Sequence, residues 1–180
     1  MALILIKEDG TGKPDANSYA AAADGDAYHE GHLYASAWTA ATLANKEAAL
    51  VMATRLINVE FQFHGFRRTS TQALEWPREK CPDRDKARNG GFVSFGPYVD
   101  SDKVPKAAVE ATCEMARELL ITDRTAAPVG EGLTLQRNTD QSEVIFNKRD
   151  RRPVVTCLAQ SMLSRFGAPV RKAGVVLVRA

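Results

Sequence analysis

The clearest periodic pattern of apolar positions lies in residues 45–61, NKEAALVMATRLINVEF. Its apolar residues recur every three or four positions and so line one side of a helix, at Ala49, Met52, Ala53, Leu56 and Ile57. The charged residues fall on the other sides. This pattern predicts an amphipathic helix over residues 45–61 that packs closely against a neighbouring element.

An alanine-rich segment, residues 18–34, predicts an earlier helix. Gly25 and Gly31 lie within it, and each costs a helix ~1 kcal/mol relative to alanine. We therefore expect this helix to depend on packing against the rest of the protein.

The second half of the chain predicts two more helices. Residues 102–123 repeat an apolar face, and Pro105 fits the first helical turn, where its missing N–H is not needed. Residues 153–167 predict a shorter helix that begins at Pro153 and is stopped by Gly167.

Alternating and apolar segments predict a small amount of β-structure. Residues 133–146 alternate around a polar turn, which predicts a hairpin, and residues 90–100 predict a shorter one. The apolar segments ALILI at 2–6 and GVVLV at 174–178 predict strands. Unpaired strands would be aggregation-prone edges. We expect these two to pair with each other or with the hairpin, or to add to a sheet of a neighbouring chain.

These elements together predict a mainly α fold: a small bundle of about four helices with a minor β element from the hairpin and the terminal strands. The 180 residues suffice for one domain and are too few for two large ones. We expect a single domain over 1–180. Its helical part, 1–123, contains a long irregular loop at 62–103, and residues 124–180 add the hairpin, a basic turn, the short helix and the last strand.

Composition narrows the class of protein. The apolar share of 44% and the charged share of 26% are ordinary for a soluble globular protein. No apolar run approaches the ~18 residues of a membrane span, and the opening residues lack the basic region and cleavage site of a signal peptide. The three cysteines are far apart and odd in number, which argues against a disulfide framework and for a reducing compartment.

The formal net charge is only +2, but its distribution is uneven. Residues 145–180 carry eight basic side chains and one acidic one. Half of these cations form a cluster before the predicted short helix: Lys148, Arg149, Arg151 and Arg152. Such a cluster can attract phosphates without regard to sequence, contact an acidic neighbouring subunit, or form a solvated turn.

The most distinctive motif is TQALEWPR at residues 71–78. Pro77 restricts Trp76 to extended backbone, which helps to fix a loop. One reading stacks a DNA base on Trp76 and places phosphates on Arg67, Arg68 and Arg78. A single aromatic ring is a poor platform for this, because single-strand binders interleave several aromatic and basic residues. We therefore favour Trp76 and Pro77 as the structural anchor of the long loop, with the three arginines at the loop edge.

Other candidate sites have weaker signals. Phe63 and Phe66 alternate as buried residues would. His29 and His32 are three residues apart, but the HExxH spacing and a third ligand are missing. No Ser/His/Asp grouping with a recognisable nucleophile elbow is present either. We expect no metal, no cofactor and no enzymatic activity.

A resemblance emerges from the order of several short motifs: ANSY, KEAAL, TQALEWPR and KVPKAAVEATCEMA. This succession, over residues 1–123, resembles a family of tailed-bacteriophage proteins often labelled "putative DnaT-like single-stranded DNA-binding protein". TQALEWPR is the most specific of the motifs. Members of that family look like head-to-tail adaptors, the helical subunits that form a ring beneath the portal.

The resemblance implies a structural protein of the virion neck, made in the host cytoplasm. It implies a ring, with twelve copies to match a portal, joined by a heterologous interface that closes. The ring would dock on the portal and on the next connector or tail-terminator protein, with genomic DNA passing through its lumen and no membrane contact. The alternative is a single-stranded DNA-binding accessory protein of phage replication, which the family label, the basic segments and Trp76 support.

Overall fold

The computed structural model describes residues 3–83, 98–126, 135–137, 143–145 and 152–170. Helices dominate these ranges, and three two-stranded antiparallel pairings accompany them, so the mainly α prediction is confirmed. The helices are α1 (Ala22–Glu30), α2 (Ser36–Thr39), α3 (Leu43–Glu60), α4 (Lys106–Ile121) and α5 (Cys157–Leu163). The strands are β1 (Phe61–Phe63), β2 (Phe66–Arg67), β3 (Arg78–Glu79), β4 (Leu135–Arg137), β5 (Glu143–Ile145) and β6 (Gly167–Pro169).

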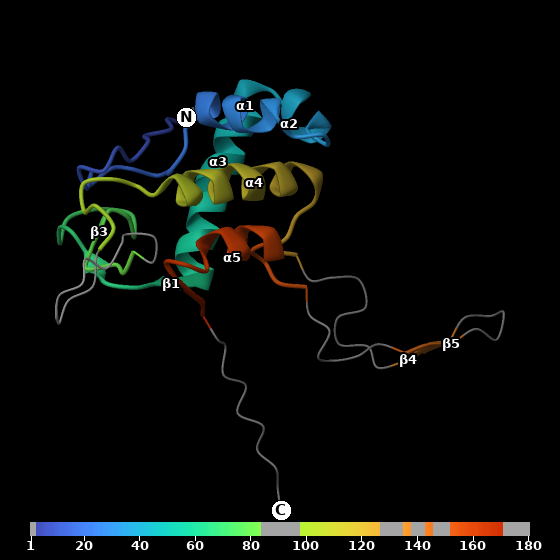
Figure 1. The fold of residues 1–180 in the computed structure, drawn as a ribbon. Coiled ribbons are helices and arrows are strands. Elements are labelled where there is room, and N and C mark those ends of the chain that lie inside the picture. Colours follow the sequence, from blue (N-terminus) through green and yellow to red (C-terminus); the bar gives the residue numbers. More distant parts are fainter. Residues whose placement is uncertain (1–2, 84–97, 127–134, 138–142, 146–151, 171–180) are drawn as a thin grey trace, which may run out of the picture.

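The longest helix, α3, runs through the middle of the fold and α4 crosses it (Figure 1). α4 contacts α1 and α2 on one side and α5 on the other, so it lies between them. Within the described part of the chain, no helix is long and apolar enough to cross a membrane. The core is filled by aromatic and aliphatic side chains, the largest of which are Trp38, Trp76, Tyr19, Phe61, Leu50, Ile57, Met115 and Leu163.

The first predicted helix is shorter than expected, because the chain turns back on itself. α1 ends at Glu30, and α2 carries Trp38 back against α1. A Cβ at Gly25 would lie 2.3 Å from the Cζ2 atom of Trp38, so only glycine allows this approach. The Trp38 indole then donates a hydrogen bond to Asp26 Oδ1 at 2.8 Å. The glycine that weakens α1 as an isolated helix makes room for a core tryptophan.

The last predicted helix is also shorter than expected. α5 begins after Thr156, whose side chain accepts a hydrogen bond from the Ala159 amide at 3.1 Å and so caps the helix. Gly167, which the sequence suggested as the end of this helix, lies in strand β6 and pairs with Phe63 of β1. A Cβ at Gly167 would lie 2.2 Å from the Gln62 carbonyl oxygen, so this strand pairing requires glycine.

The β predictions have mixed outcomes. The main hairpin is confirmed, since β4 pairs with β5. Residues 3–6 form no strand within the described chain, and the nearest β-bridge joins Lys7 to Ser18. Pairing of this segment with a neighbouring chain stays a prediction. The predicted strand at 174–178 and most of the short hairpin at 90–100 lie outside the described residues.

Candidate nucleic-acid interface

The TQALEWPR segment is built around Trp76, whose side chain has no exposed surface. Its indole meets the rings of Phe63 and Phe166 edge to face, with centroids 5.6 Å away in both cases. Pro77, also buried, follows through a cis peptide bond. A base cannot stack on a ring without exposed surface, so Trp76 joins this segment to the core.

A buried tyrosine holds the backbone next to Trp76. The Tyr19 hydroxyl accepts hydrogen bonds from the amides of Glu75 and Trp76, at 3.1 and 3.2 Å. It donates one to Asn58 Oδ1 on α3 at 2.5 Å. Burial raises the pKa of Tyr19 well above its usual range, so the hydroxyl keeps its proton and this bridge persists at any physiological pH.

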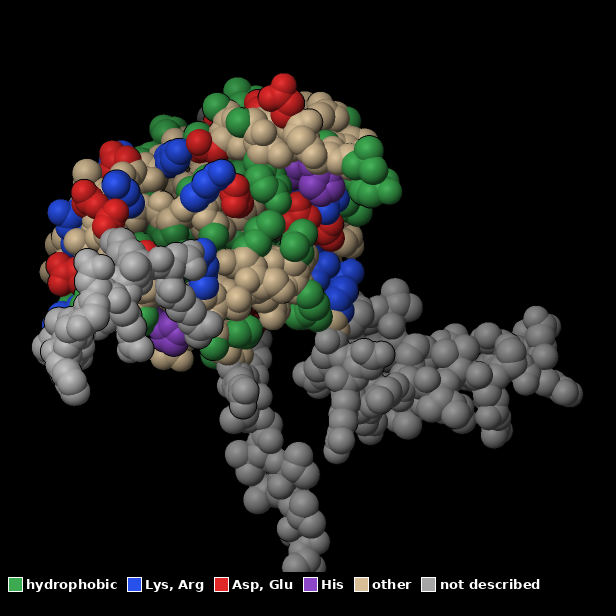
Figure 2. Space-filling view, viewed as in Figure 1, with side chains coloured by type: hydrophobic (Ala, Val, Ile, Leu, Met, Phe, Trp, Pro, Cys, Tyr) green, Lys and Arg blue, Asp and Glu red, His purple; other side chains and the backbone are tan. Residues whose placement is uncertain are grey.

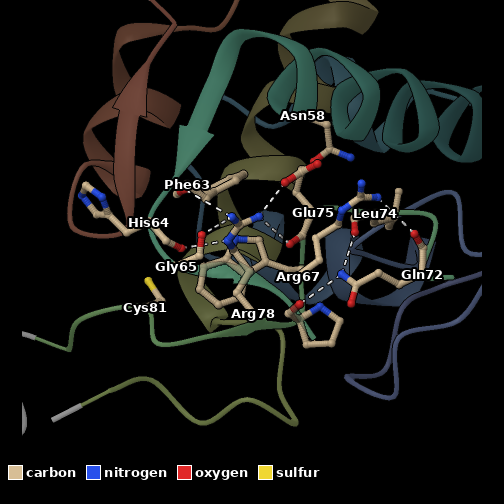
Figure 3. Close-up of polar contacts among 12 residues, drawn as sticks. Asn58, Phe63, His64, Gly65, Arg67, Gln72, Leu74, Glu75, Arg78 and Cys81 are labelled. Carbon is tan, nitrogen blue, oxygen red and sulfur yellow. Dashed lines mark hydrogen bonds and ion pairs between the residues drawn. The ribbon is translucent and has the colours of Figure 1, made fainter. Parts of the chain in front are cut away.

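Gln72, near the start of the same motif, is buried and bonds the backbone on both sides of Trp76. Its Nε2 donates to the carbonyl oxygens of Leu74 at 2.8 Å and Pro77 at 3.0 Å (Figure 3). Its Oε1 accepts from the Thr69 amide at 2.9 Å. A buried amide with these partners is satisfied, and it fixes the curve of the chain from Thr69 to Pro77.

Arg78 is a buried clamp. All five N–H groups of a guanidinium can donate, and here Nε donates to the His64 carbonyl at 2.8 Å. Nη2 donates to the carbonyls of Gly65 at 2.7 Å and Phe63 at 3.4 Å. Nη1 donates to the Glu75 carbonyl at 3.2 Å and to its carboxylate at 2.5 Å (Figure 3). Arg78, which we expected at the edge of the loop, therefore donates its hydrogen bonds to groups within the fold.

The clamp supports a short two-stranded element that we call the β2–β3 ribbon, residues 64–68 and 78–80. Gly65 makes its entry turn with a φ of +72°, and a Cβ there would lie 2.1 Å from the Glu79 carbonyl oxygen. Phe66 pairs with Glu79, and Arg67 with Arg78. The ribbon thus rests on the Arg78 clamp and on the turn at Gly65.

Phe66 projects from this ribbon. The prediction that Phe66 is buried with Phe63 is wrong: Phe63 is buried, whereas 49% of Phe66 is exposed. Alternation fails because the turn at Gly65 separates the two phenylalanines into different strands. Lys80 Nζ lies 5.3 Å from the centroid of the Phe66 ring, within cation–π range.

The exposed cations of the ribbon lack carboxylate partners among the described residues. Arg67 donates to the Gln72 carbonyl and Arg68 to the Gly10 carbonyl, at 3.4 and 2.9 Å, which leaves their charges uncompensated by those bonds. On the face shown in Figure 2, acidic and basic side chains intermingle. Ion pairs form at the buried ribbon residue Arg78 and, outside the ribbon, at Lys7, Lys13, Lys46, Lys103, Lys106, Arg117, Arg124 and Arg165.

The charge balance of the ribbon is therefore positive. Arg67, Arg68 and Lys80 are exposed, while Glu79 is the carboxylate within the ribbon, which leaves an excess of two positive charges. Glu75 does not reduce this excess, because it pairs with Arg78. Exposed cations and an exposed ring are two components of surfaces that bind single-stranded nucleic acid, and here the ribbon supplies one ring with three cations around it.

One family model matches the whole chain, residues 1–180, and its description is "Putative DnaT-like ssDNA binding protein". The chain belongs to this family. The match extends past residue 123, where the motif resemblance stopped, through the last third of the sequence. Neither the curated proteins nor the solved structures give a significant match.

The basic cluster of this DnaT-like chain is described only in part. Lys148, Arg149 and Arg151 lie outside the described residues. Arg152 is exposed, and its Nη2 donates to the Asp123 carbonyl at 3.4 Å. The described contacts of Arg152 therefore join it to the segment that follows α4.

The two histidines pack within the fold. His29 is buried, with Nε2 3.2 Å from the Cys113 carbonyl, so Nε2 carries the proton. Burial lowers the pKa of His29 and favours the neutral ring. His32 Nδ1 accepts from the Tyr34 amide at 3.0 Å. Among the side chains that the structure describes, no three are grouped to hold a metal ion.

Sequence reasoning missed the polar supports of the site. Tyr19 and Gln72 occur within the motifs ANSY and TQALEWPR, but nothing in their spacing says that they meet the Trp76 backbone. Phe66 could have been found from Gly65, since a glycine between two short apolar runs signals a turn that resets the alternation.

Proposed function

We propose that this DnaT-like chain is a non-catalytic protein that binds single-stranded DNA without sequence specificity through the β2–β3 ribbon. The observation that carries the proposal is the exposed Phe66 ring beside Lys80, in a ribbon whose exposed arginines, Arg67 and Arg68, have no carboxylate partner among the described residues. The description of the family supports the same ligand.

The physical basis is a small stacking and phosphate-binding surface. A base stacked on an aromatic ring contributes ~1–3 kcal/mol and does so for any base, because every base has a π-face. Lysine and arginine side chains add a salt-dependent attraction to phosphates. The ring belongs to Phe66 and not to Trp76, which lies in the core.

Phe66→Ala is expected to weaken binding of a labelled oligothymidylate by roughly 5- to 150-fold, the equivalent of one lost stacking contact. Lys80→Ala is expected to lower the slope of log affinity against log salt by about 0.7, the value for one phosphate contact on a single strand. Fluorescence anisotropy over a salt series measures both quantities.

Lys106→Ala provides the matched control, because Lys106 is an exposed lysine on α4 that pairs with Glu110. It should leave both affinity and salt slope unchanged. Undetectable binding by the wild-type chain, or equal losses in all three variants, would refute the ribbon as a DNA surface.

We also propose a second function, that of a head-to-tail connector subunit. It rests on the motif resemblance over residues 1–123 and on two consecutive exposed apolar residues, Leu33 at 86% and Tyr34 at 73%. Such residues are suited to a contact between subunits. In this role twelve copies would form a ring in the virion neck between the portal and the next connector or tail-terminator protein.

The connector function predicts that the chain forms rings in the presence of portal protein, and that the Leu33→Ser/Tyr34→Ser double variant reduces ring formation. Negative-stain imaging of the mixture gives the readout. A wild-type chain that forms no ring with any connector partner, yet binds single-stranded DNA through Phe66, would exclude this function in favour of the first.

A further inference from the structure

An apolar groove lies between α3 and the end of α4. It has a volume of about 380 Å³, and its floor and walls are formed by Ala48, Ala49, Met52, Leu119 and Leu120. Polar residues surround it: Asn45, Asp123 and Thr125. Exposed apolar surface of this kind commonly binds another apolar segment.

The apolar surface continues along α3 from the groove towards the end of the helix. Met52, Leu56 and Val59 follow a spacing of four and three residues, which places them on one side of the helix. Val59 is 69% exposed. At this end of α3 the Val170 amide donates to the Glu60 carbonyl at 2.9 Å. The described chain therefore leaves β6 where the apolar side of α3 ends.

Ten more residues follow Val170 in the sequence: RKAGVVLVRA, 171–180. They hold a run of four apolar residues, 175–178, between Arg171-Lys172 and Arg179. The structure does not describe them, but their length and chemistry can be compared with the groove.

The lengths agree. Met52 lies eight residues before Glu60, or about 12 Å along the helix axis, and Asn45 lies about 22 Å along it. Five extended residues, 171–175, span about 16 Å, and three more span about 10 Å. Residues 176–178 can therefore reach the groove from the position of Val170 without any rearrangement of the described fold.

We propose that residues 176–178 of the same chain bind in the groove between α3 and α4, with Arg179 at Asp123. The valine and leucine side chains would cover the apolar surface at Met52 and Leu120. Asp123 stays ionised, since hydrogen bonds from Thr125 lower its pKa. The hydrogen bonds that the described residues donate to the Asp123 carboxylate are all accepted by Oδ1. Among the described residues none donates to Oδ2, so this oxygen can accept a hydrogen bond from the Arg179 guanidinium. This inference is independent of what the ribbon binds.

Disulfide trapping tests the position of the segment. In a Cys157→Ser background, which removes the exposed cysteine, Leu177→Cys is combined either with Ala48→Cys in the groove or with Gln62→Cys in β1. Gln62 is exposed and pairs with Ala168, so it lies closer to the start of the segment than Ala48 does. If the segment does not bind in the groove, the cysteine at position 177 should therefore form a disulfide faster with position 62 than with position 48.

The docked segment predicts the reverse order, with the 48–177 disulfide forming at least ~10-fold faster than 62–177 and within a single chain. A third variant adds Met52→Asp, which should abolish this preference. Peptide mapping and non-reducing electrophoresis at low micromolar protein identify the products. An equal or faster 62–177 bond, or a 48–177 bond between copies, would overturn the proposal.

Discussion

Replacing Trp76 with alanine is expected to lower the free energy of unfolding by ~3–5 kcal/mol, the range for large aromatic side chains removed from a core. The cause is the loss of a fully buried indole packed between Phe63 and Phe166. At ~2–4 °C per kcal/mol for a chain of this size, the melting temperature should fall by roughly 6–20 °C. Urea denaturation and calorimetry measure the two quantities.

Two variants sharpen the test. Trp76→Phe should cost only ~1–2 kcal/mol, because it keeps an aromatic ring and removes an indole N–H that has no hydrogen-bond partner in the described fold. Tyr34→Ala, at an exposed position, should stay within ~0.5 kcal/mol. If Trp76→Ala left stability intact but abolished binding to single-stranded DNA, the ring would have to be a base-stacking surface after all.

The helices α3 and α4 could be predicted because each carries a long apolar period, whereas the ends of the helices could not be predicted. Residues 45–61 predict α3 to within two residues at its start, and Thr42 caps it through a hydrogen bond from the Asn45 amide. α1 is shorter than its alanine-rich sequence suggests, because Trp38 must reach Gly25. That contact depends on where α2 lies, and no local pattern contains this information.

The candidate site could be predicted only in part, for a similar reason. Pro77 and the size of Trp76 were enough to predict an anchor, since both properties belong to the residues themselves. The difference between Arg67 and Arg78 was not predictable, because the two arginines have the same chemistry and are direct partners across the ribbon. They differ in the carbonyl groups that each guanidinium reaches, and no local pattern contains that information.

These two arginines make a matched pair for the second large effect. They face each other across the ribbon, yet Arg67 is exposed and Arg78 is buried. Arg78→Met is expected to cost on the order of 3 kcal/mol, because it leaves the carbonyls of Phe63, His64 and Gly65 without their donor inside the fold. Arg67→Met should cost less than ~0.5 kcal/mol. Urea denaturation of both variants gives the comparison.

Arg78→Lys separates charge from geometry. A lysine keeps the charge near Glu75, but its three donors on one nitrogen cannot span the carbonyls that the planar guanidinium bridges. Most of the stability lost in Arg78→Met should therefore also be lost in Arg78→Lys. Full rescue by lysine would mean that the ion pair with Glu75 matters and the carbonyl clamp does not. In that case the position of the β2–β3 ribbon, and with it the exposure of Phe66, would need another explanation than the clamp.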